Sequence, residues 1–188
     1  VDGIMGKERA KEIAKKILER KLKIRFTIEC RSDDIDIEVF SLLRKAGLLK
    51  VFVGIESGSQ SVLDRYNKET TVKQNEHAIK VLNSLGIKCE PGYIFFDPAT
   101  TKKELLDTYD FFSQNVDKLY APMQGSGNNR LYFIHGAPLL PYFWPNKTTS
   151  FYEGVAEETL PYPYLNEEAS SLCERYSNVL SFTTKLPS

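Results

Sequence analysis

Short polar runs follow four apolar segments of the chain, and they contain side chains that could bind a small charged or hydroxylated ligand. Glu29 and Arg31 end the first segment, residues 56–59 follow the second, Asp97 follows the third and residues 124–127 follow the fourth. A carboxylate can hold ribose hydroxyls or a ligand amino group, and a guanidinium can hold a ligand carboxylate. The runs therefore indicate one binding site, provided that the four segments end side by side.

Structural roles for the same residues stay open at the level of sequence. Glu29 and Arg31 could form a surface ion pair with each other. Ser57 and Ser59 could each cap the helix that follows them, with Gly58 providing the turn. Capping and ligand contact can also coexist in one residue.

The cysteines and histidines do not form a pattern that binds metal. Cys30, Cys89 and Cys173 lie far apart in the sequence, and His77 and His135 have no ligand partners at suitable spacing. Neither a zinc site nor a disulfide framework is indicated, and a reducing cytoplasm fits best. No metal ligand and no catalytic side chain can be assigned from these residues.

The elements that position the polar runs alternate between strand and helix patterns. Strands are predicted over residues 23–30, 50–55, 88–96 and 118–123, and helices over residues 7–21, 37–46, 60–66, 73–85 and from residue 102 onward. Alternating units of this kind form a parallel sheet, so we expect an α/β fold, namely a partial parallel (β/α) barrel of about four strands. The carboxyl ends of such strands, where ligands bind, carry the polar runs.

Two helix starts and one helix face are specific enough to be checked. Capping boxes are predicted at Thr71 with Gln74 and at Thr101 with Glu104. In the helix after Thr101, the apolar residues expected to point inward are Leu105, Leu106, Tyr109 and Phe112. Beyond Gly136 the composition shifts toward proline and aromatic residues, so we expect barrel over residues 1–139 and an appended extension, a possible substrate cap, over residues 140–188.

Composition excludes some classes of partner. Lys plus Arg equals Asp plus Glu at 25 each, so no net charge attracts the chain to nucleic acid or to anionic lipid. No apolar stretch approaches the roughly 20 residues that span a bilayer. The sequence thus favours a cytoplasmic protein that binds a small molecule.

One long segment resembles a known family. It carries Gly-Ile-Glu-Ser-Gly at residues 54–58, Lys68 with Thr71 about a dozen residues later, Leu-Gly-Ile at 85–87, and Asp-Pro-x-Thr-Thr at 97–101. These elements are similar to the fourth-to-fifth strand region of radical S-adenosylmethionine (radical SAM) enzymes, in the branch of Elp3-, MiaB- and NifB-like and cobalamin-associated proteins. Residues 129–139 resemble the segment after the family's sixth strand, with Ala137 replacing the commoner threonine.

The resemblance implies a fold, a reaction and a set of cofactor-binding residues. The family has a six-stranded partial barrel and cleaves S-adenosylmethionine to a 5'-deoxyadenosyl radical with a four-iron four-sulfur cluster. Carried over, Glu29 and Arg31 would contact the methionyl end, Glu56 the ribose and Lys68 the carboxylate, and Gly92 would allow close backbone approach. The cofactor-binding residues implied in full are Glu29, Arg31, Glu56, Ser57, Gly58, Lys68, Gly92 and Asp97.

The resemblance does not include the cysteine loop that holds the cluster. We therefore expect a C-terminal fragment of a radical SAM enzyme that is inactive alone, with cobalamin in a domain outside this chain and ferredoxin or flavodoxin as reductant. Its substrate, a small molecule or a peptide, is not indicated, and a nucleic-acid or membrane partner is not expected. Two alternatives stay open: a non-catalytic degenerate barrel that serves as a binding or scaffold module, and an unrelated phosphate-binding barrel enzyme.

Overall fold

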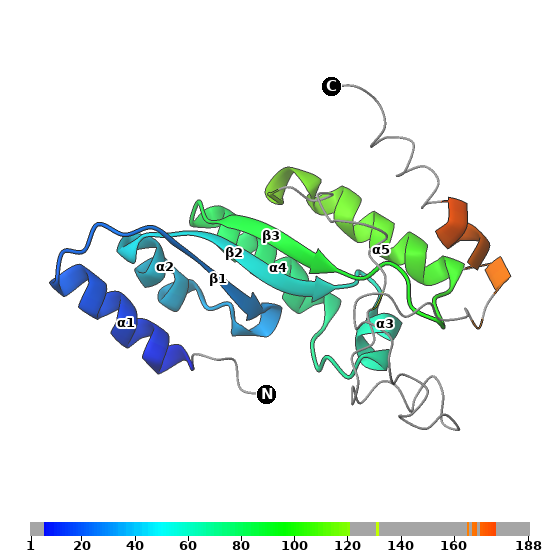
Figure 1. The fold of residues 1–188 in the computed structure, drawn as a ribbon, viewed down its shortest axis with the longest axis horizontal. Helices are drawn as coiled ribbons and strands as arrows, with labels where there is room; N and C mark the ends of the chain where they lie inside the picture. The colour runs from blue at the N-terminus through cyan, green and yellow to red at the C-terminus, as the bar shows by residue number, and fades with distance from the viewer. Residues whose placement is uncertain (1–5, 121–130, 132–164, 166, 169, 176–188) are drawn as a thin grey trace, which may run out of the picture. The chain divides into compact units, whose positions relative to one another are not determined.

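The computed structural model describes residues 6–120, 131, 165, 167, 168 and 170–175 (Figure 1). The chain divides into two compact units. The first contains residues 1–93 and 108–124, and the second contains residues 94–107 and 125–188. The predicted boundary at residue 139 lies outside the described residues and stays a prediction.

The first unit is built on a parallel sheet of three strands in the order β1-β2-β3. Their bounds are β1 Phe26–Arg31, β2 Leu48–Glu56 and β3 Lys88–Tyr93. The helices along the chain are α1 Lys7–Glu19, α2 Ile37–Ala46, α3 Gln60–Arg65, α4 Val72–Ser84 and α5 Lys102–Asn115, with short 3₁₀ turns η1 Ser32–Asp34 and η2 Val116–Lys118. The expected α/β fold with a parallel sheet is confirmed, and the described sheet is open and has three strands instead of about four.

The fourth predicted strand is replaced, in the described part of the chain, by a single bridge. Leu119 pairs in parallel with Cys89, and the Tyr120 amide donates to the Cys89 carbonyl at 2.7 Å. Residues 121–123 of that prediction lie outside the described residues. The third strand also ends earlier than expected, at Tyr93 instead of residue 96.

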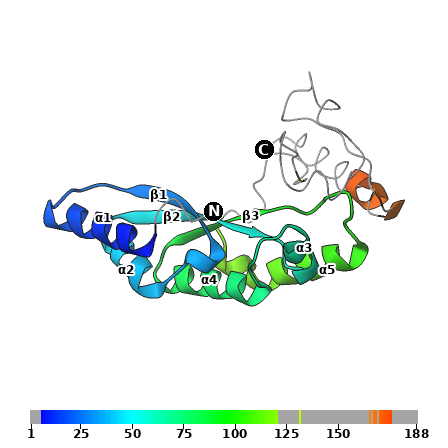
Figure 2. The ribbon, with the colours of Figure 1, turned by 90° about the horizontal axis from the view of Figure 1, so that it is seen from below.

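One face of the sheet forms the hydrophobic core. Helices α1, α2 and α4 lie on the same side of the strands (Figure 2). Val51, Val53 and Ile55 of β2 are fully buried on this side, because alternate residues of a strand project to the same face. Burial of such side chains is the main driving force that holds helices to a sheet.

The opposite face carries polar residues and glycines. Residues that pair directly across neighbouring strands project to the same face, so the register defines layers across the sheet. Counted toward the carboxyl ends of the strands, these layers are Thr27–Lys50–Lys88, Glu29–Phe52–Glu90 and Arg31–Gly54–Gly92. We call this side the open face.

Local sequence signals determine the helix ends. The Asp36 carboxylate accepts from the backbone amides of Glu38 and Val39 at the start of α2, and Gly47 ends that helix with φ of +113°. At the start of α4, Thr71 and Gln74 form the predicted capping box. None of the helices in the described residues is long and apolar enough to cross a membrane.

Candidate functional site

Glu56 is the last residue of β2, and its carboxylate lies on the open face. A Cβ atom on Gly54, which belongs to the open-face layers, would lie 2.8 Å from Glu56 Oε1. The Glu56 backbone has φ of +60°, a left-handed conformation that costs energy for a residue with a side chain. This backbone conformation brings the Glu56 carboxylate back over Gly54, and the strand pairing ends at this residue.

Lys68 holds the Glu56 carboxylate in this position. Its Nζ lies 2.6 Å from Glu56 Oε1, and the two side chains are 18% and 21% exposed. The flanking residues Asn67 and Glu69 have φ of +48° and +56°, so Lys68 occupies a tight turn. A Cβ on Gly54 would also lie 3.0 Å from the lysine Nζ, so the ion pair sits directly on a glycine.

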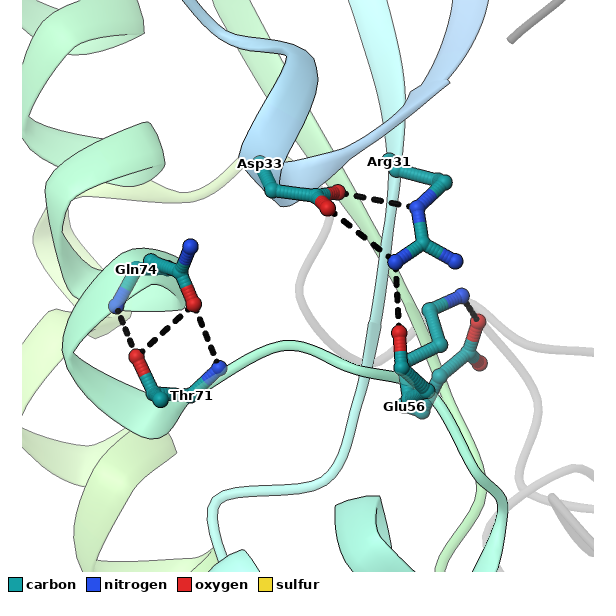
Figure 3. A network of polar contacts seen from close by, with 6 residues as sticks. Arg31, Asp33, Glu56, Thr71 and Gln74 are labelled. Atoms are coloured by element: carbon teal, nitrogen blue, oxygen red, sulfur yellow. Dashed lines mark hydrogen bonds and ion pairs between the residues drawn. The ribbon is translucent and has the colours of Figure 1, made fainter. Parts of the chain in front are cut away.

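Arg31 connects β1 to the same turn. Its guanidinium pairs with Asp33 through two hydrogen bonds of 2.9 and 3.1 Å and also donates to the Lys68 backbone carbonyl (Figure 3). The alternative of a Glu29–Arg31 ion pair is wrong, because Asp33 in η1 is the carboxylate that meets this arginine. No sequence signal indicated Asp33 beyond its distance of two residues from Arg31.

Burial raises the pKa of Asp33, but the hydrogen bond and the charge of Arg31 lower it, and the net pKa lies below the ordinary value of 3.8. The hydrogen bond to Asp33 in turn raises the pKa of Arg31. Both side chains therefore stay charged at neutral pH. The resulting chain of contacts runs from Asp33 through Arg31 and the Lys68 backbone to Glu56.

Ser57 and Gly58 lie beneath the end of β2. The Ser57 hydroxyl is 2.8 Å from Thr108 Oγ1 and accepts from the Ser59 amide at 3.0 Å. A Cβ on Gly58 would lie 2.3 Å from the Phe111 Cβ, so only glycine fits against α5. Ser59 is the N-cap residue of α3, but its side chain makes no capping hydrogen bond. Ser57 is thus buried and engaged inside the protein.

Asn75 and Thr108 support this strand end, and reading the sequence missed both. Asn75 is fully buried in α4, and its Nδ2 donates to the carbonyls of Ile55 at 3.0 Å and Ser57 at 3.3 Å. Asn75 lies three residues before Ala78, so it is on the apolar face of the helix, and this spacing could have indicated that it is buried. A polar residue on a buried helix face needs a partner, and here the partner is the backbone at the end of β2.

The helix face predicted for α5 is wrong at two positions. Leu106 and Tyr109 are 53% and 66% exposed, whereas Phe112 is buried as predicted. The buried positions of this helix include polar residues, because Thr108 bonds Ser57 and the Asn115 amide donates to the Phe111 carbonyl at 2.8 Å. The predicted capping box at Thr101 and Glu104 is present.

Gly92 and Glu29 also belong to the open face. A Cβ on Gly92 would lie 2.6 Å from Cζ of Phe52, so the tip of that ring covers the glycine. Glu29 pairs in register with Phe52, one layer before Arg31 on the same strand. The structure therefore places Glu29, Arg31, Glu56 and Gly92 on one face, as the shared site requires.

Asp97 belongs to the second unit. It is fully buried, and its Oδ1 accepts from the Ala99 amide at 2.7 Å while its own amide donates to Thr100 Oγ1 at 2.7 Å. These contacts form a turn of the kind that aspartate favours. The carboxylate thus orders the loop that leads into α5.

The described cysteines do not fit an iron-sulfur cluster. Burial, and next the nearby charge of Asp34, raise the pKa of Cys30 to about 12, and burial raises the pKa of Cys89 to about 12. An iron-sulfur cluster needs several cysteine thiolates close together. The described residues contain no group of three side chains that could hold a metal ion.

The fold and the open face together define a class of protein. A parallel sheet with helices on one side, and with a carboxylate, an ammonium and glycines where β2 and β3 end, is typical of (β/α) folds, a class in which ligands bind at the strand ends. Residues 4–112 match the model of the radical SAM superfamily. The chain belongs to this superfamily.

Curated relatives and solved structures agree with the family. The chain is 38% identical over 100 residues to an anaerobic magnesium-protoporphyrin IX monomethyl ester cyclase of Rubrivivax gelatinosus, covering 52% of this chain and 18% of that protein. It is 31% identical over 124 residues to 4'-phospho-dehydrooxetanocin synthase of Priestia megaterium, covering 60% of this chain and 16% of that protein. The chain therefore spans less than a fifth of either relative.

Among solved structures, the cobalamin-dependent radical enzyme OxsB, with aqua-cobalamin and S-adenosylmethionine bound, matches with a TM-score of 0.56 and 30% identity. That match covers 60% of this chain and 17% of OxsB. Elp3 of Methanocaldococcus infernus matches with a TM-score of 0.57 at 16% identity over 97% of this chain and 42% of Elp3, and shows the fold alone.

Proposed function

We propose that this chain forms the part of a radical SAM enzyme that binds the adenosyl portion of S-adenosylmethionine. The observation that carries the proposal is Glu56, whose carboxylate lies on the open face at the end of β2 and keeps Oε2 without a hydrogen bond to the described residues. Such an oxygen can accept from ribose hydroxyls, a role that strand-end carboxylates perform in other nucleotide sites.

Lys68 contributes in two ways under this proposal. It fixes the Glu56 carboxylate at 2.6 Å, and its ammonium is available to a ligand carboxylate on the same face. Arg31, which was expected at the methionyl end, holds the Lys68 turn through its backbone carbonyl. The absence of a side chain at Gly54 and Gly92 leaves room on the sheet for the Glu56–Lys68 pair and for the tip of the Phe52 ring.

The cofactors of the whole enzyme follow from the family and are part of the proposal. Bound S-adenosylmethionine supplies a 5'-deoxyadenosyl radical when a cluster reduces it, but the described residues contain no group of three side chains that could hold such a cluster. We therefore expect the chain by itself to bind the adenosyl group without cleaving S-adenosylmethionine. Cobalamin bound outside this chain, a ferredoxin or flavodoxin reductant and a cytoplasmic location complete the proposal, supported by the cobalamin named for OxsB.

The first test measures adenosyl binding directly. S-adenosylhomocysteine is titrated into the 188-residue chain by calorimetry, and Glu56→Gln is expected to weaken its binding by about tenfold or more, because hydrogen bonds to charged groups contribute about 1.5–3 kcal/mol. Glu38→Gln on the exposed side of α2 makes the same change of charge and should bind normally. Equal affinity of the Glu56 variant and the unaltered chain would refute the assignment.

A further inference from the structure

A second part of the open face lies one layer from the proposed adenosyl site. The Glu56 carboxylate lies over Gly54, which is two residues from Phe52 along β2, or about 7 Å of strand. The layer Glu29–Phe52–Glu90 thus lies farther from the carboxyl ends of the strands than the Glu56–Lys68 pair does. A group held on this layer would lie directly beside a ligand bound to Glu56.

Phe52 is an exposed aromatic ring on a charged surface. It is 39% exposed, and it is the one hydrophobic side chain among the strand residues of the three open-face layers in the described sheet. Its ring tip rests on Gly92, where a Cβ would lie 2.6 and 2.7 Å from Cζ and Cε1. An exposed ring supported in this way offers a stacking surface to a planar group.

Glu29 lies beside Phe52 in the same layer and is exposed. The described residues offer it no hydrogen bond and no ion pair, whereas Glu90, on the other side of Phe52, pairs with Lys50. The nearest cation on its own strand, Arg31, is engaged by Asp33 and the Lys68 carbonyl. Glu29 is therefore available as an acceptor for a ligand N–H or O–H.

We propose that Phe52 and Glu29 form a substrate subsite for a planar ring system that carries an N–H or O–H donor. The ring stacks on Phe52, and the donor binds the Glu29 carboxylate. The inference rests on the proposed function, because it assigns this layer to the second ligand of a site whose first ligand is an adenosyl group. Glu29 then faces the substrate instead of the methionyl end.

The test uses two probes that differ in one group. Indole has a planar ring and an N–H donor, and benzofuran has the same shape with an oxygen in place of the N–H. In titrations of the full chain followed by NMR, benzofuran should bind about threefold to tenfold more weakly than indole, as expected for the loss of one hydrogen bond. Equal affinities, or no binding of indole, would overturn the assignment of Glu29.

Substitutions separate the two contacts. Phe52→Leu should weaken both probes, and Glu29→Met should remove the preference for indole while benzofuran still binds. Gly92→Ala provides a second test of the ring, because the added Cβ must displace the tip of Phe52 without removing it. Tyr109→Leu, which removes an exposed ring from α5, should leave both affinities unchanged. Loss of binding in the Tyr109 variant would show nonspecific adsorption and would contradict the subsite.

Saturating S-adenosylhomocysteine distinguishes this subsite from the adenosyl site. Indole should bind with undiminished affinity to the saturated chain. If S-adenosylhomocysteine binds and displaces indole, the Phe52 ring belongs to the adenosyl site and the inference is wrong. If S-adenosylhomocysteine itself fails to bind, the proposed function fails first, and the substrate assignment that rests on it fails too.

Discussion

The Arg31–Asp33 pair illustrates how a charged side chain can position a neighbouring residue through its backbone. The resemblance to radical SAM enzymes suggested a direct contact between Arg31 and the methionyl end. In the structure, two of its nitrogens bind Asp33, and one of these also holds the Lys68 carbonyl. The position of Lys68, and through it the position of Glu56, depends on this arginine.

Asp33→Asn tests this dependence. The neutral amide loses the charge-assisted pair, so the Lys68 turn should loosen and S-adenosylhomocysteine should bind about threefold to tenfold more weakly, as measured by calorimetry. Asp34→Asn removes the same charge one residue along and should have little effect. If the two variants bind alike, Arg31 does not position the site through Asp33.

The same pair makes stability depend on pH in a defined direction. The folded-state pKa of Asp33 lies below its ordinary value of 3.8, so the folded state favours the ionised form. Its contribution is fully present above the unfolded pKa and is lost as the pH falls through the folded pKa. Urea denaturation across this acidic range should show a smaller loss of stability in Asp33→Asn than in the unaltered chain.

At the scale of elements, the sequence predicted the regular segments well. Helix α2 has the predicted bounds, and both capping boxes are present, because a cap depends on neighbours in the sequence. The inward face of α5 could not be predicted in the same way. Thr108 is buried because Ser57, 51 residues earlier, provides a hydrogen-bond partner, and this partner is set by tertiary contact. The candidate site was also predictable only in part. The position of Glu56 at the end of a predicted strand indicated that residue, but no such signal indicated Asp33, Asn75 or Phe52.

Thr108→Val tests the contact between α5 and the end of β2. Valine keeps the shape but leaves the buried Ser57 hydroxyl without its 2.8 Å partner and the Gly58 amide without its 3.3 Å acceptor. The free energy of unfolding should fall by about 1–3 kcal/mol, measured by urea denaturation. Thr27→Val makes the same replacement at an exposed strand position and should change stability by about 0.5 kcal/mol or less. A Thr108 variant as stable as the Thr27 variant would show that this hydrogen bond contributes little.

At the scale of the whole molecule, the open face and the buried thiols define what this chain contributes. The side chains proposed to bind a ligand lie on one face of the sheet in the first unit, while Cys89 lies buried in the sheet. The chain covers 18% and 16% of its curated relatives, so the remaining parts of such an enzyme are encoded by sequence beyond this segment in those proteins. We therefore propose that this chain provides one part of the binding site of such an enzyme.

Anaerobic reconstitution tests whether the chain alone can bind a cluster and cleave S-adenosylmethionine. With iron and sulfide supplied, the chain should bind no four-iron four-sulfur cluster and, with a chemical reductant and S-adenosylmethionine, release no 5'-deoxyadenosine. The reason is that the described residues, which include all three cysteines, contain no group of three side chains that could hold a metal ion. Absorbance and chromatography of the nucleoside provide the two readouts. A bound cluster of this type, or detectable deoxyadenosine, would contradict the proposed inability to cleave.

The left-handed backbone at Glu56 restricts which amino acids evolution or an engineer could place there. With φ of +60°, valine, isoleucine and threonine would be strained by their branched Cβ, whereas glycine, asparagine and aspartate tolerate this region. Only aspartate in that tolerant group keeps the negative charge, and its shorter side chain would fall short of Lys68. The strand end thus allows few replacements that preserve both folding and charge, which makes this codon an informative one to saturate in a selection for adenosyl binding.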